Sequence, residues 1–285
     1  MINKIALILR KTFPNVYQKI LNIKQGRYIY SFSKEKYPHS FLVHDAPHLN
    51  VKENAPEVIY CFWTGDNPLT ENRKKGLEAL EKNAGVPVKL ITPENLPDYI
   101  LPEYPLHKGY EFLSLTMRSD YLRCYFMHHH GGGYADIKPF NHSWKSAFEK
   151  LNQNQNKYVL GYPELLQGGL APANHRFIEN KKYKNYDKML IAENLVYCDL
   201  VKYTPLLIGN CGFICKPYTP ITTEWYQEVH NRMDELNDYF NESTSNDFSS
   251  IPYFYLVQIF HPLILKYHQH IIQYKKLLPV LKDYR

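Results

Sequence analysis

The feature that most constrains the fold is a strand, a helix and a second strand that follow one another within about 35 residues. Residues 58–63 form an unbroken apolar run, as a strand buried on both faces would. A loop at 64–68 leads to Thr70, which is suited to cap a helix, and apolar residues then recur at helical spacing up to Gly85, which is placed to end it. Residues 88–91 form the second strand. This pattern predicts an α/β fold with parallel strands.

The same patterns predict the elements that follow. We expect a helix over 116–129, strands over 134–138, 158–162 and 206–215, and a helix that opens at Thr219 with Pro220 in its first position. The polar stretch 237–250 is expected to be a loop. The chain then divides into a basic N-terminal extension (1–55), one α/β domain (56–245) and a basic, aromatic tail (246–285) that packs on the domain or on a membrane.

Positive charge is concentrated at the two ends of the chain. The formal net charge is +6, and residues 1–34 and 248–282 contain Lys and Arg but no Asp or Glu. Such segments suit the anionic inner face of a membrane, nucleic acid would attract the same charge, and a solvated basic surface is a third interpretation. The apolar run 5–9 is too short for a spanning helix, and Arg10 and Lys11 interrupt it, which also argues against a secretory signal.

The five cysteines show no metal-binding spacing. Their odd number and apolar neighbours indicate free thiols in a reducing compartment. We therefore expect a cytoplasmic protein, whose basic ends would allow peripheral contact with the membrane.

The segment 113–140 holds the most informative residues. On the predicted helix, Asp120 and Arg123 are three residues apart and share a face. Gly131–Gly133 end the helix and would let the backbone approach a ligand closely. Three residues of the strand that follows share one face: Tyr134, Asp136 and Lys138. Spacing alone fits a ligand site and a surface ion pair beside a glycine cap equally well.

Three consecutive histidines, 128–130, end the predicted helix. A metal site is one interpretation. Because consecutive residues of a helix point in different directions, we instead expect a capping cluster that interacts with the negative end of the helix dipole.

The sequence resembles the DxD-containing glycosyltransferases of the GT-A type (family-32-like), which include proteins of capsular polysaccharide synthesis. The matching segments are Ile59–Pro68, Arg118–Arg123, Gly131–Lys138 and, more loosely, Leu207–Ile214. The resemblance implies a GT-A-like, Rossmann-related domain with a mixed central sheet flanked by helices. It also implies transfer of a sugar from a nucleotide-sugar donor, with UDP favoured, to an oligosaccharide or lipid-linked glycan of a surface polysaccharide, mostly with retention of the anomeric configuration.

The resemblance also assigns roles to individual residues. Asp136 would occupy the first acidic position of the motif, near the ribose, a divalent cation or both. Donor-binding candidates are Trp63, Thr64 and Gly65 near the base and ribose, and Arg118, Asp120, Arg123 and Tyr134 near the nucleotide or the donor sugar. Glu164 and Asn210 are candidates for the acceptor or sugar side, each weighed against a structural role.

Lys138 departs from the motif, because it stands where the second acid is expected. In such enzymes the paired carboxylates hold Mn²⁺ or Mg²⁺, which neutralises the leaving diphosphate. Three interpretations stay open. Lys138 supplies that charge itself as a catalytic residue beside Asp136, or the cation persists, held by Asp136, phosphates and a tail histidine such as His261, or the site is inactive.

Two other functions compete with sugar transfer. A non-catalytic member of the same fold would bind a nucleotide sugar or a glycan and assist a partner, and Lys138 is its only motivation. A basic nucleic-acid-binding protein would explain the charged ends, but the central motif does not favour it, and we expect no nucleic acid as partner.

Overall fold

The computed structural model describes residues 28–46, 51–164, 170, 186–242 and 257–281. The strands are β1 (Ile59–Phe62), β2 (Val88–Ile91), β3 (Gly132–Ala135), β4 (Val159–Pro163), β5 (Ile208–Cys215) and β6 (Ile271–Gln273). The longer helices are α3 (Glu71–Ala84), α4 (Leu115–His129), α5 (Lys145–Asn152), α6 (Tyr186–Lys202), α7 (Pro220–Glu242) and α8 (Val257–Lys266). Short 3₁₀ turns lie between them, among them Leu96–Tyr99 and Tyr110–Phe112.

The strand–helix–strand unit predicted at the start of the domain is confirmed. All four residues of β1 are buried, and β1 pairs in parallel with β2. The hydroxyl of Thr70 accepts the backbone N–H of Arg73 at 3.4 Å and caps α3, which ends at Gly85 in the left-handed conformation, with φ of 70°.

In the described part of the chain, six strands form one mixed sheet in the order β2-β1-β3-β5-β4-β6. β5 runs antiparallel to both of its neighbours, whereas β1–β2, β1–β3 and β4–β6 are parallel pairs. The carboxyl ends of β1, β3 and β4 and the start of β5 therefore lie along one edge of the sheet. This arrangement confirms the predicted α/β domain with a mixed central sheet, and such an edge is where α/β proteins bind ligands.

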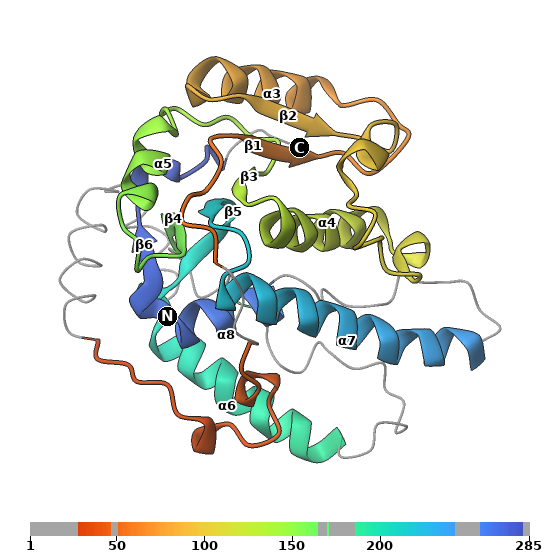
Figure 1. Ribbon diagram of the computed structural model, residues 1–285, viewed down its shortest axis with the longest axis vertical. Helices are drawn as coiled ribbons and strands as arrows, with labels where there is room; N and C mark the ends of the chain where they lie inside the picture. The colour runs from red at the N-terminus through yellow and green to blue at the C-terminus, as the bar shows by residue number, and fades with distance from the viewer. Residues whose placement is uncertain (1–27, 47–50, 165–169, 171–185, 243–256, 282–285) are drawn as a thin grey trace, which may run out of the picture.

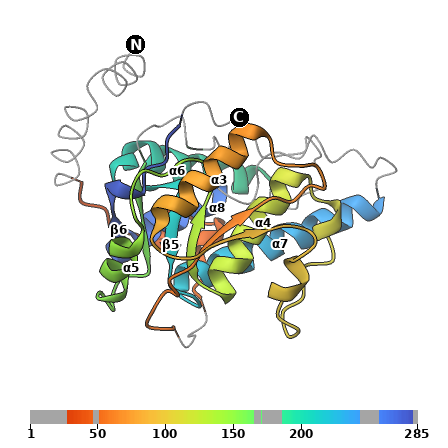
Figure 2. The same ribbon diagram turned by 90° about the horizontal axis from the view of Figure 1, so that it is seen from above.

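Helices cover both faces of the sheet (Figure 1). Tyr60 and Phe62 of β1 point into a core shared with α4, α7 and α8, whereas Ile59 and Cys61 point to the opposite face, where α3 and α5 pack. Because its side chains alternate between the two faces of the sheet, β1 contributes two residues to each of the two cores. On the first face, α4 and α7 lie side by side (Figure 2).

Both terminal segments contribute to the domain where the structure describes them. Tyr30 and Leu42 of the N-terminal stretch are buried in the larger core. The tail supplies α8, whose Phe260 is fully buried, and β6, which extends the sheet beyond β4. From its sequence, the stretch 1–21 could form a basic amphipathic helix broken near Pro14, but it lies outside the described residues.

The basic charge of the tail is not all at the surface. Lys266 is buried, pairs with Glu224 at 2.8 Å, and donates to the carbonyl of Leu42 at 3.0 Å. Among the described helices, none has the length and apolar character to cross a bilayer. The five cysteines are free thiols, as the sequence predicts.

Several element boundaries differ from the predictions by one to three residues or more. β3 ends at Ala135 rather than at Lys138, because the backbone N–H of Lys138 donates to the carbonyl of Asp136 at 2.7 Å and bends the chain. α7 continues to Glu242, through the first residues of the predicted loop. α4 begins one residue early, after the cap residue Ser114.

Candidate functional site

A cleft of about 370 Å³ opens at the edge of the sheet where β1 and β3 end. Its walls come from the loop after β1, the first turn of α3, the N-terminal half of α4 and the end of β3. The loop is fixed in place because Thr64 donates to the carbonyl of Leu115 at 2.7 Å. The predicted site residues in the wall are Trp63, Thr64, Gly65, Asp120, Arg123, Tyr134 and Asp136. The structure therefore brings together Asp136 and every predicted donor-binding residue except Arg118.

Helix α4 presents a carboxylate, Asp120, and a guanidinium, Arg123, to this cleft. The hydroxyl of Ser114 accepts the N–H of Met117 at 3.4 Å, which starts the helix at the sheet edge. Asp120 and Arg123 then lie on one face with 3.5 Å between their charged atoms, and both side chains are buried. Arg123 also donates from Nη1 to the carbonyl of Asn210 at 3.0 Å, which ties α4 to β5.

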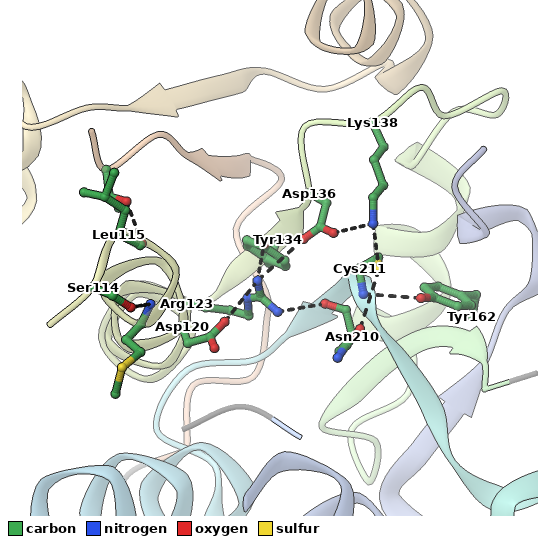
Figure 3. A network of polar contacts seen from close by, with 12 residues as sticks. Ser114, Leu115, Asp120, Arg123, Tyr134, Asp136, Lys138, Tyr162, Asn210 and Cys211 are labelled. Atoms are coloured by element: carbon green, nitrogen blue, oxygen red, sulfur yellow. Dashed lines mark hydrogen bonds and ion pairs between the residues drawn. The ribbon is translucent and has the colours of Figure 1, made fainter. Parts of the chain in front are cut away.

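Asp136 follows β3 and is held from two sides (Figure 3). Its Oδ1 accepts the hydroxyl of Tyr134 at 2.5 Å, and its Oδ2 accepts Nζ of Lys138 at 2.6 Å. Nη2 of Arg123 lies 3.5 Å from Oδ1, and the guanidinium stacks 3.9 Å from the centre of the Tyr134 ring. Burial opposes ionisation of Asp136, but Arg123 and Lys138 outweigh it and hold the pKa of this carboxyl below its ordinary value.

The net pKa shift of Asp120 has the opposite direction. Burial raises its pKa to about 6, with Arg123 acting against the rise and Asp136 adding to it. Arg123 lies 3.5 Å from both carboxylates. At neutral pH the two ionised acids are balanced by Arg123 and Lys138, so the cluster carries no net charge.

Lys138 lies behind Asp136 rather than in the wall of the cleft. Its side chain is 6% exposed, and Nζ also contacts Sγ of Cys211 at 3.1 Å. The backbone N–H of Cys211 in turn donates to the hydroxyl of Tyr162 at 3.3 Å. The ammonium therefore faces Asp136 from the protein side. Its position does not match the expected direct contact with a diphosphate, and any effect on the cleft passes through Asp136.

A second cavity, of about 520 Å³, adjoins the first across Trp63 and Thr64, which line both. Its wall is mainly apolar and includes Ile91, Leu96, Ile100, Leu106 and Leu122. Arg118 lines this second cavity, where it donates to the carbonyls of Leu113 at 3.1 Å and Glu111 at 2.6 Å. Two predicted donor-binding residues of α4, Arg118 and Asp120, thus belong to different cavities.

Glu164 and Asn210 lie at the same sheet edge, but neither is among the residues that line the two cavities. Glu164 follows β4, and its N–H donates to the carbonyl of Leu207 at 3.0 Å. Asn210 uses its carbonyl to hold Arg123. Both could meet an acceptor that approaches from the β4–β5 side.

His261 does not reach the cleft. It is fully buried in α8, Nε2 donates to the carbonyl of Ile208 at 3.1 Å, and burial lowers its pKa to about 4. Its Nδ1 has no hydrogen-bond partner among the described residues. A shared cation between this histidine and Asp136, one of the sequence-based expectations, is not supported by this placement.

A family model of the capsular polysaccharide synthesis protein matches residues 10–195, which is more than half of the 285-residue chain. The chain belongs to this family. The comparisons with curated proteins and with solved structures found no match. The family match runs through β1, α4 and β3, so it contains Asp120 and Asp136, whereas Asn210 and His261 lie beyond it. Family membership implies a biosynthetic enzyme with a role in capsular polysaccharide synthesis.

The triple glycine of this family member serves packing rather than contact with a ligand. Gly131 and Gly132 have positive φ values of 67° and 92°. A Cβ atom on Gly131 would lie 2.5 Å from Pro217, and one on Gly132 would lie 2.9 Å from the carbonyl oxygen of Val58. None of the three glycines lines the cleft. The expectation that the turn approaches a ligand finds no support here, since the ring of Pro217 and the backbone at Val58 occupy the space beside Gly131 and Gly132.

The histidines at the end of α4 also differ from the expectation. His128 and His129 are buried, and their rings pack 4.8 Å from the ring of Tyr226. Burial lowers the pKa of His128 to about 3 and that of His129 to about 4, so both are neutral at neutral pH. Packing, rather than a charge near the helix dipole, accounts for their position.

The donor set around Asp136 does not fit a divalent cation. Mn²⁺ and Mg²⁺ prefer several oxygen ligands, but both oxygens of Asp136 already accept hydrogen bonds, one of them from an ammonium group. The other carboxylate of the cleft, Asp120, is paired with Arg123. Across the described residues, no group of three or more His, Cys, Asp or Glu side chains is arranged to hold a metal.

Sequence reasoning missed one cationic residue of the cleft. Arg73 lies in the first turn of α3 and lines the cleft, and its Nη1 donates to the carbonyl of Ile137 at 2.8 Å. The predicted helix cap at Thr70 could have indicated its position, because it places Arg73 in the first turn of the helix. The first turn of a helix that follows β1 lies at the carboxyl edge of the sheet, so a cation there faces the same ligands as the loop.

Proposed function

We propose that this member of the capsular polysaccharide synthesis family transfers a sugar from a nucleotide-sugar donor, with UDP favoured, to a glycan acceptor. The observation that carries the proposal is the pair of adjoining cavities that share Trp63 and Thr64, one mainly apolar and one lined by charged groups. A nucleotide sugar has the same two parts, a flat base with its ribose and an anionic diphosphate with its sugar. The family match independently supports a polysaccharide substrate.

In this arrangement the base enters the apolar cavity and the diphosphate and sugar enter the charged cleft. Trp63 offers an apolar ring at the boundary, and Arg118, whose guanidinium lies 5.4 Å from the centre of the Tyr110 ring, closes the far wall. The carboxylates of Asp120 and Asp136 accept hydrogen bonds from sugar hydroxyls. The acceptor approaches along the edge that carries Glu164 and Asn210.

The reaction breaks the bond between the anomeric carbon and a diphosphate oxygen, releases the nucleoside diphosphate, and forms a bond to an acceptor hydroxyl oxygen, whose proton passes to the departing diphosphate or to water. Positive charge develops at the anomeric centre, as in other glycosyl transfers. Asp136, held ionised by Arg123 and Lys138, stabilises this charge, and the rigid network around it positions the sugar. Lys138 is then a positioning residue. Retention of configuration follows from the family resemblance alone, and we assign no nucleophile.

The test is a panel of UDP-, GDP- and CMP-sugars against the purified protein, with thermal unfolding and release of the free nucleotide as readouts. We expect one nucleotide class to raise the unfolding temperature, because a ligand at one hundred times its Kd stabilises by about 2.7 kcal/mol. The same class should release its nucleotide slowly by hydrolysis and faster with acceptor. A folded sample that responds to none of these donors would contradict the proposal.

The pairing of Lys138 with Asp136 also favours a second candidate, a member that binds the donor without turning it over. This alternative predicts the same rise in unfolding temperature but no release of nucleotide, with or without a glycan acceptor. The two readouts of the panel therefore separate the candidates.

A further inference from the structure

A diphosphate in the cleft requires positive charge, and two of the cationic groups nearby are already engaged. Arg123 donates to the carbonyl of Asn210 and to Tyr134, and lies 3.5 Å from each of the two carboxylates. Lys138 is buried against Asp136 and does not line the cleft. Arg123 cannot turn to a phosphate without leaving the buried Asp120 unpaired, which is unfavourable. The buried Lys138 cannot do so without giving up its ion pair with Asp136.

Arg73 is placed differently. It is partly exposed, it comes from α3 rather than from α4, and it lines the cleft together with Gly65 and Asn67 of the loop after β1. Its Nη1 donates to the carbonyl of Ile137 at 2.8 Å, which fixes the guanidinium next to the bend that carries Asp136.

The packing of α3 explains how Arg73 reaches this position. A Cβ atom on Gly76 would lie 3.3 Å from Cα of Lys138 and 3.4 Å from the carbonyl oxygen of Ile137. The glycine thus lets the helix approach the bend after β3 closely, and Arg73, one turn earlier, projects over the same bend. This contact is built from backbone on one side, so it does not depend on a mobile side chain.

Arginine is suited to a diphosphate, because its planar guanidinium presents several N–H donors that match pairs of phosphate oxygens. We propose that Arg73 binds the diphosphate of the sugar donor and that its charge takes the place of a divalent cation. Such a cation lacks ligands here, because both oxygens of Asp136 already accept hydrogen bonds. The inference rests on the proposed function, since it takes a nucleoside diphosphate as the ligand. Arg73 lies within the family match but outside the four segments that resemble the glycosyltransferase motif, on α3 rather than on α4 or β3.

The experiment is isothermal titration of the full chain with UDP and UMP, and with GDP and GMP, each in EDTA and in Mn²⁺. We expect the diphosphate that binds to show the same Kd in EDTA and in Mn²⁺ within about twofold, and Arg73→Ala to weaken it about tenfold or more. Arg73→Ala should weaken binding of the monophosphate less than binding of the diphosphate, a difference that a merely structural role of Arg73 would not produce. Lys74→Ala is the matched control, because this neighbouring lysine is exposed, pairs with Glu71 and does not line the cleft.

Arg73→Lys guards against a folding defect, because it keeps the charge and should recover part of the affinity in a protein that unfolds at the wild-type temperature. Two results would overturn the inference and leave the proposed function intact. One is a Kd about tenfold weaker in EDTA than in Mn²⁺, and the other is wild-type affinity in Arg73→Ala. If neither UDP nor GDP binds in either condition, the inference fails, and the response to the CMP-sugars in the donor panel decides whether the proposed function fails with it.

Discussion

The two ends of α4 bury polar side chains in opposite ways. Near its start, Asp120 and Arg123 are each about 95% buried and stay charged, because each has a partner at 3.5 Å. At its end, His128 and His129 are buried to a similar degree but lie among aromatic rings, and burial holds them neutral. Opposite charge compensates burial at one end, and loss of charge does so at the other. Only the end that keeps its charges lines the cleft.

Of the changes considered, removal of Arg123, the cation shared by Asp120 and Asp136, should have the largest effect on stability. Arg123→Met leaves the buried carboxylate of Asp120 unpaired and removes one of the two cationic partners of Asp136, so we expect the free energy of unfolding to fall by about 3–5 kcal/mol. Urea unfolding at neutral pH measures it. The double variant Asp120→Asn, Arg123→Met should recover part of the loss, because one unpaired charge is gone. A loss below about 1 kcal/mol would show that the cluster is solvated and that the contrast with the histidine end is false.

Asp136→Asn tests the same end through catalysis rather than stability. The amide keeps the shape and can still accept the hydroxyl of Tyr134, but it removes the negative charge that faces the sugar. We expect turnover to fall by about 10²–10³, as for loss of one charge-stabilising group, and the unfolding temperature to fall as well, because the buried ammonium of Lys138 loses its ionised partner. Asp98→Asn, at an exposed acid on the 3₁₀ turn Leu96–Tyr99, is the control. Wild-type turnover in Asp136→Asn would remove this residue from the site.

Local patterns predicted the start of the domain well. The apolar run of β1, the cap at Thr70 and Gly85 each act through neighbouring residues, and all three are confirmed. The face shared by Asp120 and Arg123 is equally local, because helical spacing alone brings the two side chains together.

The features that the sequence did not predict depend on contacts between distant segments. The bend that ends β3 at Ala135 and the pairing of β6 with β4 arise from tertiary structure. Arg73 could not be placed in the cleft without knowing that Gly76 lets α3 pack on the bend at Lys138. The roles of the triple glycine and of His261 were misjudged for the same reason, since their neighbours come from other elements.

At the histidine end, the expected effects are smaller and appear with pH. The pKa of His128 is lowered from 6.5 to about 3 by burial, so the folded state binds fewer protons than the unfolded state between these values. Its contribution to stability is therefore complete above about pH 6.5 and is lost as the pH falls, by up to about 1.4 kcal/mol per pH unit. His128→Phe should keep stability at pH 7 within about 1 kcal/mol and reduce the loss in acid. Urea unfolding from pH 4 to pH 7 would detect it, and an unchanged acid slope would mean that this histidine is solvated.

Asp120 should act against the histidines over part of the same range. Its pKa is raised from 3.8 to about 6, so the folded state binds the proton more tightly, and the resulting stability is present at low pH and is lost as the pH rises through this window. In the wild type this opposes the histidine effect between about pH 4 and 6 and flattens the curve. Asp120→Asn removes the opposition, so we expect stability to rise more steeply with pH, by at most about 1.4 kcal/mol per unit, in the urea series used for His128→Phe. If the slope is instead unchanged, Asp120 is ionised throughout this range, and the charged end of α4 contrasts with the neutral histidine end more sharply than the raised pKa of Asp120 indicates.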